Sequence, residues 1–190
     1  NPMYRESVVC VQETHLTSDA IPGFRQVARR VGFNVYAVPC RGSGVRAAGG
    51  LAVLTPRGAC SRFVQDTADD FAMSVWVGSV HVMNVYRPHE QSVLQGRVAL
   101  SEALQKHGLL RARAAVVLGD FNEALGGPLT SMLVAFGFAR CPCDGPTRWQ
   151  SDSPGDHVFV KGFAAPPVHR ILHHLSDHIP LSIDVPADMQ

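Results

Sequence analysis

The sequence predicts a single α/β domain built from layers of strands and helices, and three observations support this prediction. Short apolar runs alternate with helical patterns along the whole chain, which is typical of a mixed α/β layer structure. The 190 residues fit one domain, and no linker or low-complexity tract divides them. Hydrophobic residues make up 46% of the chain and charged residues 17%, so a sizeable core is available and intrinsic disorder is disfavoured.

The first half of the chain is expected to hold one helix among several strands. The run at 7–11 is continuous and rich in β-branched residues, as expected of a strand that is buried on both faces. Apolar residues at 24–31 recur at helical spacing between Pro22-Gly23 and Gly32, which predicts a helix. The other strands are expected at 33–38, 51–55, 72–77 and 79–86, with a glycine-rich loop at 41–50 and a tight turn at Gly78.

The second half is expected to continue the alternation of helices and strands. Ser92 is a candidate N-cap for a helix that ends near Gly108 and whose apolar face includes Leu94, Val98 and Leu104. A short helix closed by a glycine is expected at 129–136, and strands are expected at 115–118, 157–160, 168–172 and 179–185.

Charge, hydropathy and cysteine content exclude several classes of protein. Seventeen basic and sixteen acidic residues leave a net charge of +1, which excludes a strongly cationic nucleic-acid-binding coat but not a local basic patch. No apolar run approaches the roughly 20 residues that a membrane span requires. The five cysteines are an odd number, which argues against a complete disulfide framework, so we expect reduced thiols and an intracellular protein.

Acidic residues stand at the ends of several expected strands. Glu13 and Asp120 each follow a buried strand, while Asp156 and Asp177 each precede one, and His178 lies beside the last. Strand ends that share one rim of a sheet are where α/β proteins place their ligands. Converging carboxylates repel one another unless a cation compensates, and Mg²⁺ favours oxygen ligands. The alternative is that these are ordinary turn acids, which are favoured at strand ends for backbone reasons.

Five short segments, taken in order, resemble the endonuclease/exonuclease/phosphatase superfamily. They are QET at 12–14, NVYRP at 84–88, GDFN at 119–122, DHVFV at 156–160 and SDH at 176–178. This superfamily includes DNase I-like nucleases, abasic-site endonucleases, endonuclease domains of non-LTR retrotransposons, deadenylases and inositol phosphatases. The set covers about 8–185 and looks most like the abasic-endonuclease and retrotransposon branch. The resemblance implies a four-layer α/β/β/α sandwich of the DNase I type, in which two mixed sheets pack face to face between helices.

The resemblance also implies a set of metal ligands and catalytic residues. Glu13 would be the main ligand of Mg²⁺, with Mn²⁺ as an alternative, and Asp177 would assist metal binding or the leaving oxygen. Asp120 would deprotonate the attacking water, while Asn122 would orient it and bond a phosphate oxygen. Tyr86 would contact the scissile phosphate or support the leaving group.

Asp156 is expected to hold the imidazole of His178 in its charged form. The resemblance implies this pairing, and elementary electrostatics supports it, because a carboxylate beside an imidazole raises the pKa of the imidazole. The imidazolium would then face the phosphate and stabilise its developing negative charge.

Five further residues are candidates for substrate binding. Arg41 and Arg46, in the glycine-rich loop, can grip a phosphodiester backbone because Arg donates paired hydrogen bonds to phosphate, although a solvated loop is an equal alternative. The resemblance adds Asn84 and Thr147 as supporting residues. Trp149 lies in a polar loop and is the better candidate for stacking on a base.

The expected activity is Mg²⁺-dependent hydrolysis of a phosphodiester, foremost endonucleolytic cleavage of DNA that leaves a free 3′-hydroxyl. The expected partner is therefore nucleic acid, DNA before RNA, with no membrane and a monomeric chain; a retroelement origin would imply a nuclear location. The alternatives are a phosphoesterase that acts on RNA or a phosphoinositide, and a catalytically inactive relic of the fold.

One departure from the family concerns the N-terminus. The family opens with a strand that carries an Asn of the metal and phosphate site, followed by a helix, before the strand that ends in QE. Only seven residues precede Val8, and the chain begins with Asn1 rather than Met. We therefore expect a fragment or truncated form that lacks this first strand.

Overall fold

The computed structural model describes residues 7–42, 48–64, 69, 71–149, 155–171 and 176–186. Its strands are β1 (Val9–Val11), β2 (Phe33–Val38), β3 (Leu51–Pro56), β4 (Ser61–Phe63), β5 (Ala72–Val77), β6 (Val80–Tyr86), β7 (Ala114–Asp120), β8 (Ala139–Arg140), β9 (Asp156–Lys161), β10 (His169–Arg170) and β11 (Leu181–Ser182). Its helices are α1 (Ile21–Arg30), α2 (Val93–Lys106), the short 3₁₀ helix η4 (Leu109–Arg111) and α3 (Pro128–Ala135). No helix in these ranges is long and apolar enough to cross a membrane.

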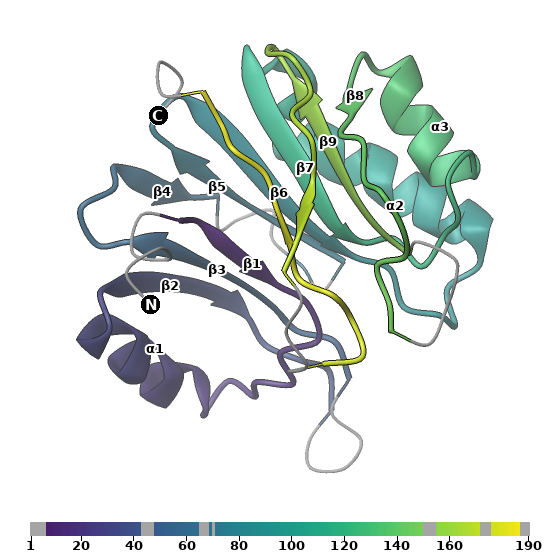
Figure 1. Cartoon of the computed structure of the whole chain (residues 1–190). Helices are drawn as coiled ribbons and strands as arrows, with labels where there is room; N and C mark the ends of the chain where they lie inside the picture. Colours follow the sequence, from purple (N-terminus) through teal and green to yellow (C-terminus); the bar gives the residue numbers. More distant parts are fainter. Residues whose placement is uncertain are drawn as a thin grey trace.

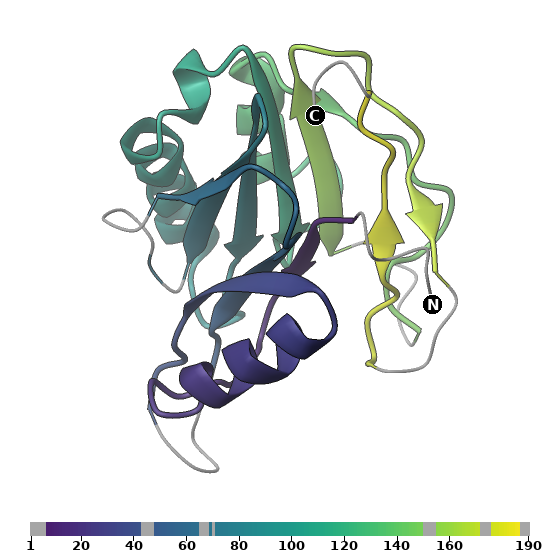
Figure 2. The ribbon, with the colours of Figure 1, turned by 90° about the vertical axis from the view of Figure 1, so that its left-hand side faces the viewer.

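These elements form a four-layer sandwich (Figures 1 and 2). A three-stranded sheet in the order β1-β3-β2 packs against a six-stranded sheet in the order β4-β5-β6-β7-β9-β8. Helix α1 covers the outer face of the smaller sheet, and α2 with α3 covers the outer face of the larger one. The predicted α/β/β/α architecture is therefore confirmed.

The alternation of side chains along the strands explains how the smaller sheet fills two layers of core. Leu51 and Val53 point into the core between the sheets, where they join Met73 and Val75 of β5. Leu54, the next residue along β3, packs on the other face with residues of α1 and β2. Successive side chains of a strand point to opposite faces, so β3 contributes to both cores.

The two sheets differ in strand direction. Strands β6 and β7 are parallel and their connection runs through α2, while all other neighbouring pairs of the larger sheet are antiparallel. The smaller sheet is antiparallel throughout in the described part of the chain, where β1 bonds only β3. The prediction of two mixed sheets is thus correct for one of them. A separate short sheet pairs β10 with β11.

Helix α2 begins as predicted, and its buried face is the predicted one only at Leu104. The Ser92 side chain accepts a hydrogen bond from the Gln95 backbone, and Gln95 bonds back to complete a capping box. Leu94 and Val98 of the predicted apolar face are 70% and 51% exposed. The buried residues of this helix are Gly96, Leu100, Ala103 and Leu104. A glycine starts the buried face because the Arg87 side chain crosses the helix there, at 2.6 Å from where a Cβ of Gly96 would lie.

Several strands differ from their predicted extent. The strands expected at 168–172 and 179–185 shrink to His169–Arg170 and Leu181–Ser182. The short strands Ser61–Phe63 and Ala139–Arg140 were not predicted. All four strands are two or three residues long, which is too short to show a periodic pattern in the sequence. Strands of this length depend on pairing with a neighbouring strand.

Candidate active site

The register of the larger sheet brings three of the predicted residues to one edge. Tyr86 ends β6 and pairs with Asp120 at the end of β7, and Asp120 pairs with Asp156 at the start of the antiparallel strand β9. Gly119 makes this register attainable, because its φ is +140° and a Cβ there would lie 1.9 Å from the carbonyl oxygen of Val85. The close approach of β6 and β7 thus places Tyr86 beside Asp120.

Asp120 is almost fully buried and is held by the turn that follows it. Its Oδ1 accepts a hydrogen bond from the backbone N–H of Asn122 at 2.9 Å, and its Oδ2 accepts one from the Asn122 amide at 3.1 Å. Asn122 has a φ of +46°, a left-handed conformation that Asn tolerates better than most residues. Arg87 secures the turn by donating through Nε to the carbonyl of Phe121 at 2.7 Å. The carboxylate of Asp120 is therefore fixed in direction.

His178 lies between the carboxylates of Asp156 and Asp120. Its Nδ1 is 3.0 Å from Asp156, and its Nε2 is 3.9 Å from Oδ2 of Asp120. The hydrogen bond to Asp156 raises the pKa of His178 above its ordinary value, which favours the cation. The predicted pairing of these residues is thus present in the structure.

Thr147 positions Asp156 from within the protein. The Thr147 side chain is fully buried, and its hydroxyl oxygen accepts hydrogen bonds from the backbone N–H groups of Gly155 and Asp156, each at 3.2 Å. Its carbonyl accepts from the N–H of Ile179 at 2.8 Å, next to His178. The structure gives Thr147 the expected role of a supporting residue, because a buried hydroxyl with these partners positions Asp156, while contact of Thr147 with a substrate stays a prediction.

Asn84 is also a buried support rather than a surface contact. Its amide donates to the carbonyl of Val11 at 3.0 Å and to that of Ala52 at 3.1 Å, and its oxygen accepts from the Gln12 amide. These bonds join β6 of the larger sheet to β1 and β3 of the smaller one. The side chain is fully buried, so Asn84 has the expected role of a supporting residue, and its contact with a substrate stays a prediction.

Glu13 follows β1 directly and reaches Tyr86. Burial of Tyr86 and its hydrogen bond to Glu13 raise the pKa of the phenol. His15, which the sequence analysis did not single out, places its Nε2 3.5 Å from Oε2 of Glu13. Both Glu13 and His15 have positive φ, and the N–H of His15 donates to the carbonyl of Gly49 at 3.0 Å. The smaller sheet thereby presents a carboxylate and an imidazole at the edge where Tyr86 lies.

Arg148 is the second site residue that sequence reasoning missed. Its Nη2 donates to Oδ2 of Asp120 at 3.1 Å and to Oδ1 of Asn122 at 2.5 Å. Burial and the neighbouring Asp156 raise the pKa of the Asp120 carboxyl, while Arg148 and His178 oppose this rise. The only signal in the sequence is its position directly after Thr147, because nothing in the local pattern indicates that a loop arginine turns toward Asp120.

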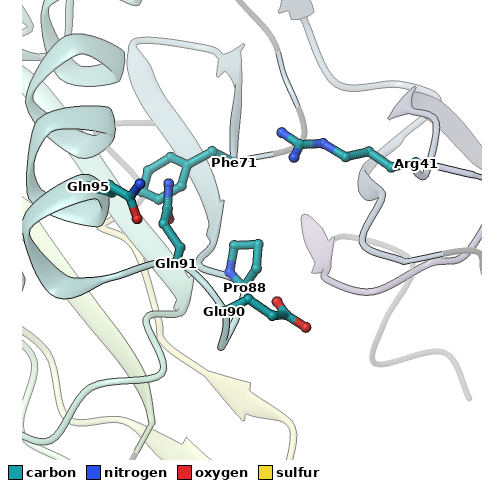
Figure 3. Close-up of a pocket in the computed structure, with 6 residues that line it drawn as sticks. All are labelled: Arg41, Phe71, Pro88, Glu90, Gln91 and Gln95. Carbon is teal, nitrogen blue, oxygen red and sulfur yellow. The ribbon is translucent and has the colours of Figure 1, made fainter.

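The remaining predicted residues lie around this cluster. Asp177 is exposed beside His178, and its carbonyl accepts from the backbone N–H of Trp149, a partly buried residue. Arg46 lies outside the described residues. Arg41 lines a groove of about 360 Å³ together with Phe71, Pro88, Glu90, Gln91 and Gln95. Figure 3 shows the guanidinium of Arg41 pointing across this groove toward Phe71.

The chemistry of these side chains fits a hard divalent cation. Ligand atoms of Asp120, Asp156 and His178 all lie within 4.8 Å of one another. Arg148 and the His178 cation already offset part of the negative charge of that cluster. Glu13 and Asp177 add exposed carboxylates next to it, and carboxylate oxygens are the ligands that Mg²⁺ prefers.

The sequence and the fold of this chain are similar to those of known nucleases. The sequence model of the Endonuclease/Exonuclease/phosphatase family matches residues 3–178. A comparison with curated proteins gives no match. Among solved structures, the 3′-5′ exonuclease NExo from Neisseria meningitidis is similar, with a TM-score of 0.70 and 18% identity over 94% of this chain and 89% of that chain.

Two further solved structures share the fold. An AP endonuclease from Archaeoglobus fulgidus has a TM-score of 0.66 and 18% identity, covering 97% of this chain and 92% of that chain. The endonuclease domain of TRAS1, a telomere-specific non-LTR retrotransposon, has a TM-score of 0.66 and 15% identity, covering 95% of this chain and 85% of that chain. Together with the family match across most of its length, the fold and the acidic cluster show that the chain belongs to the endonuclease/exonuclease/phosphatase family.

Proposed function

We propose that this protein is a metal-dependent phosphodiesterase that cleaves DNA endonucleolytically. One observation carries the proposal: a buried carboxylate, Asp120, lies 3.9 Å from the imidazole of His178, and Asp156 holds that imidazole from the other side. Phosphodiester hydrolysis needs a base that takes a proton from the attacking water and a cation that offsets the negative charge on the phosphoryl oxygens. Asp120 and His178 lie next to each other and suit these two tasks.

Asp120 is the base of the proposed reaction. A water oxygen attacks phosphorus in line with the leaving oxygen while its proton passes to the Asp120 carboxylate. The bond from phosphorus to the leaving 3′-oxygen breaks, this oxygen takes up a proton from solvent while Asp120 releases its proton to solvent, and the products are a free 3′-hydroxyl and a 5′-phosphate. Asn122 holds Asp120 through two hydrogen bonds, so the base keeps its direction toward the water.

His178, Tyr86 and the metal ligands stabilise charge in this reaction. The His178 imidazolium faces the phosphoryl oxygens and offsets their growing negative charge. Tyr86, whose pKa is raised by burial and by Glu13, keeps its proton and donates a hydrogen bond to the leaving oxygen. Mg²⁺, when bound, neutralises phosphoryl oxygens, and Glu13 and Asp177 are the residues that would hold it.

Two observations support DNA as the substrate. The similar structures include an exonuclease, an AP endonuclease and a retrotransposon endonuclease domain. The groove lined by Arg41, Glu90, Gln91 and Gln95 is formed in part by the segment that follows Tyr86 in the sequence. It offers a guanidinium for a phosphate and amides for base edges.

A substrate panel tests the proposal. We expect nicking of duplex DNA with Mg²⁺, no nicking with EDTA, and at least about 10²-fold less nicking by Asp120→Asn. RNA and soluble inositol phosphates are assayed beside DNA. Preferred cleavage of RNA or of an inositol phosphate would replace DNA as the substrate. A folded protein that binds no Mg²⁺ and cleaves none of the three would overturn the proposal in favour of an inactive relic.

A further inference from the structure

Arg148 is the residue of the site whose role the proposed reaction leaves open. It lies in the loop before β9, and its backbone pairs with that of His178 in an isolated bridge. The next residue, Trp149, donates its N–H to the carbonyl of Asp177 at 3.0 Å. The backbone of Arg148 is thus attached to the segment that carries His178, so its side chain starts from a defined place in the site.

The guanidinium of Arg148 points into the acidic cluster and still has donors to offer. Nη2 alone serves both Oδ2 of Asp120 and Oδ1 of Asn122. Nε is buried and has no hydrogen-bond acceptor among the described residues. A guanidinium carries five N–H donors in a planar fork that matches the oxygens of a carboxylate or phosphate. Within the described part of the chain, the protein therefore uses the fork only in part.

The ion pair with Arg148 restrains Asp120 in its proposed role. The Asp120 side chain is 3% exposed and that of Arg148 21%, so water screens their attraction weakly. A carboxylate that accepts from an arginine is a poorer base, because the arginine favours its charged, unprotonated form. An anionic phosphodiester brings two further oxygens to the same cluster, and these compete with Asp120 and Asn122 for the fork.

We infer that Arg148 binds the scissile phosphate, and that its transfer from Asp120 and Asn122 to that phosphate frees Asp120 to act as the base. This inference rests on the function proposed above and adds a residue and an order of events to it. Substrate binding and activation of the base become one step: the anion that needs cleavage removes the cation that restrains the base. The ligand is a phosphodiester of nucleic acid, recognised through its non-bridging oxygens.

The test separates binding from chemistry. Arg148→Gln removes the fork, Arg148→Lys keeps the charge without the fork, and Arg30→Gln on the exposed last turn of α1 is the control with the same loss of charge as Arg148→Gln. Binding of a fluorescent DNA duplex is measured by anisotropy in EDTA, where no cleavage occurs. The kinetic parameters kcat and KM are then measured with Mg²⁺.

We expect Arg148→Gln to weaken duplex binding in EDTA about 10-fold and to lower kcat/KM at least about 10²-fold, as for loss of a bidentate phosphate contact. Arg148→Lys should recover part of the binding and less of kcat, and Arg30→Gln should stay within about 2-fold of wild type, as for a surface charge. A circular dichroism melt checks folding, and the lysine variant carries the test if Arg148→Gln unfolds.

Three results would overturn the inference. Unchanged binding by Arg148→Gln with a lower kcat would make Arg148 only a positioning residue for Asp120. A higher kcat of Arg148→Gln would mean that the ion pair between Arg148 and Asp120 only inhibits the enzyme. If the wild type did not bind the duplex, there would be no phosphate contact to explain. If the wild type binds duplex but cleaves nothing, the proposed function fails, whereas a loss of binding in Arg148→Gln still supports the phosphate contact.

Discussion

The Nδ1 atom of His178 lies 3.0 Å from both carboxylate oxygens of Asp156. This symmetric approach joins a short loop to the start of β9, and it turns Nε2 of the imidazole toward Asp120 at 3.9 Å. A histidine held in this way donates a hydrogen bond from its Nδ1–H group to the carboxylate. This bond orients the ring and stabilises the cation. Asp156 is therefore the neighbour that favours the charged form of His178 most strongly.

The pKa of His178 is the first testable quantity. The Asp156 hydrogen bond raises the His178 pKa above the ordinary 6.5, so His178 loses its proton only as pH rises through the raised value. The stability that the pair contributes is complete below pH 6.5 and is lost over the same rise. We expect Asp156→Asn to lower the His178 pKa and to move the alkaline limb of activity to lower pH.

An NMR titration of the His178 ring protons measures this shift. Asp144→Asn, an exposed acid in the preceding loop, is the matched control and should leave the titration unchanged. An unchanged His178 pKa in Asp156→Asn would show that the hydrogen bond does not determine the charge.

The second prediction concerns the three residues with the most distinct proposed roles. Glu13→Ala, Asp120→Asn and His178→Ala should each lower turnover at least about 10²-fold, as for loss of a metal ligand, a base or a charge-stabilising group. Steady-state rates on duplex DNA with Mg²⁺ provide the measurement. Glu102→Gln on α2, which is exposed and paired with Lys106, should keep the wild-type rate. Near-normal rates in all three variants with native circular dichroism would mean that the site is assigned incorrectly.

The third prediction concerns the amide that joins the two sheets. Asn84→Ala removes two donors and leaves the carbonyls of Val11 and Ala52 without them in a buried place. We expect a loss of about 2–3 kcal/mol in the free energy of unfolding, and faster hydrogen exchange in β1, which carries Glu13 at its end.

Urea unfolding and exchange monitored by mass spectrometry give both quantities. Asn34→Ala, on the partly exposed face of β2, is the control and should cost under about 0.5 kcal/mol. A stability loss in Asn84→Ala without faster exchange in β1 would place the role of this amide elsewhere than in holding Glu13.

The fourth prediction concerns a buried polar chain far from the acidic cluster. Nε2 of His81 lies 2.9 Å from the Ser74 hydroxyl, which in turn lies 2.7 Å from Nδ1 of His107, and the Trp76 ring stacks on His81. Burial, followed by the charges of His107 and Arg62, lowers the pKa of His81 to about 4.

The sign of the resulting pH dependence follows from proton binding. Between pH 6.5 and about 4 the unfolded chain binds a proton at this position and the folded protein does not, so stability falls as pH falls. We expect this group to contribute a loss of about 3 kcal/mol across that range. Urea unfolding at several pH values should show a flatter profile for His81→Gln and an unchanged one for His169→Gln, an exposed control. Parallel profiles for His81→Gln and wild type would contradict the prediction.

The sequence predicts the elements better than their faces. Short apolar runs predict most strands to within two residues. The reason is that a strand buried on both faces is a continuous run of apolar residues, which is visible in the sequence. The buried face of α2 was predicted correctly at Leu104 and wrongly at Leu94 and Val98, which lie on the exposed side. That face is determined by the Arg87 side chain, which packs at Gly96 from another segment.

The acidic and imidazole side chains of the site were predictable, and their surroundings were not. The acids at strand ends were recognisable as site residues in the sequence. Strand register then places two of them, Asp120 and Asp156, opposite each other on neighbouring strands. Arg148 and His15 went unnoticed, because a loop residue reveals its direction only when its contacts are known. Thr147 and Asn84 were expected to support the site, but only the structure shows which backbone groups they bond.

By itself, the sequence determined the family, the layered fold and the carboxylates that come together at one edge, since periodicity and motif order are properties of the chain alone. The tertiary structure decided which cation meets Asp120, which histidine lies beside Glu13 and which polar groups are hidden between the sheets. The physical reason is that these contacts join residues far apart in the sequence. Their energies depend on burial and on distances that exist only after the sheets have packed.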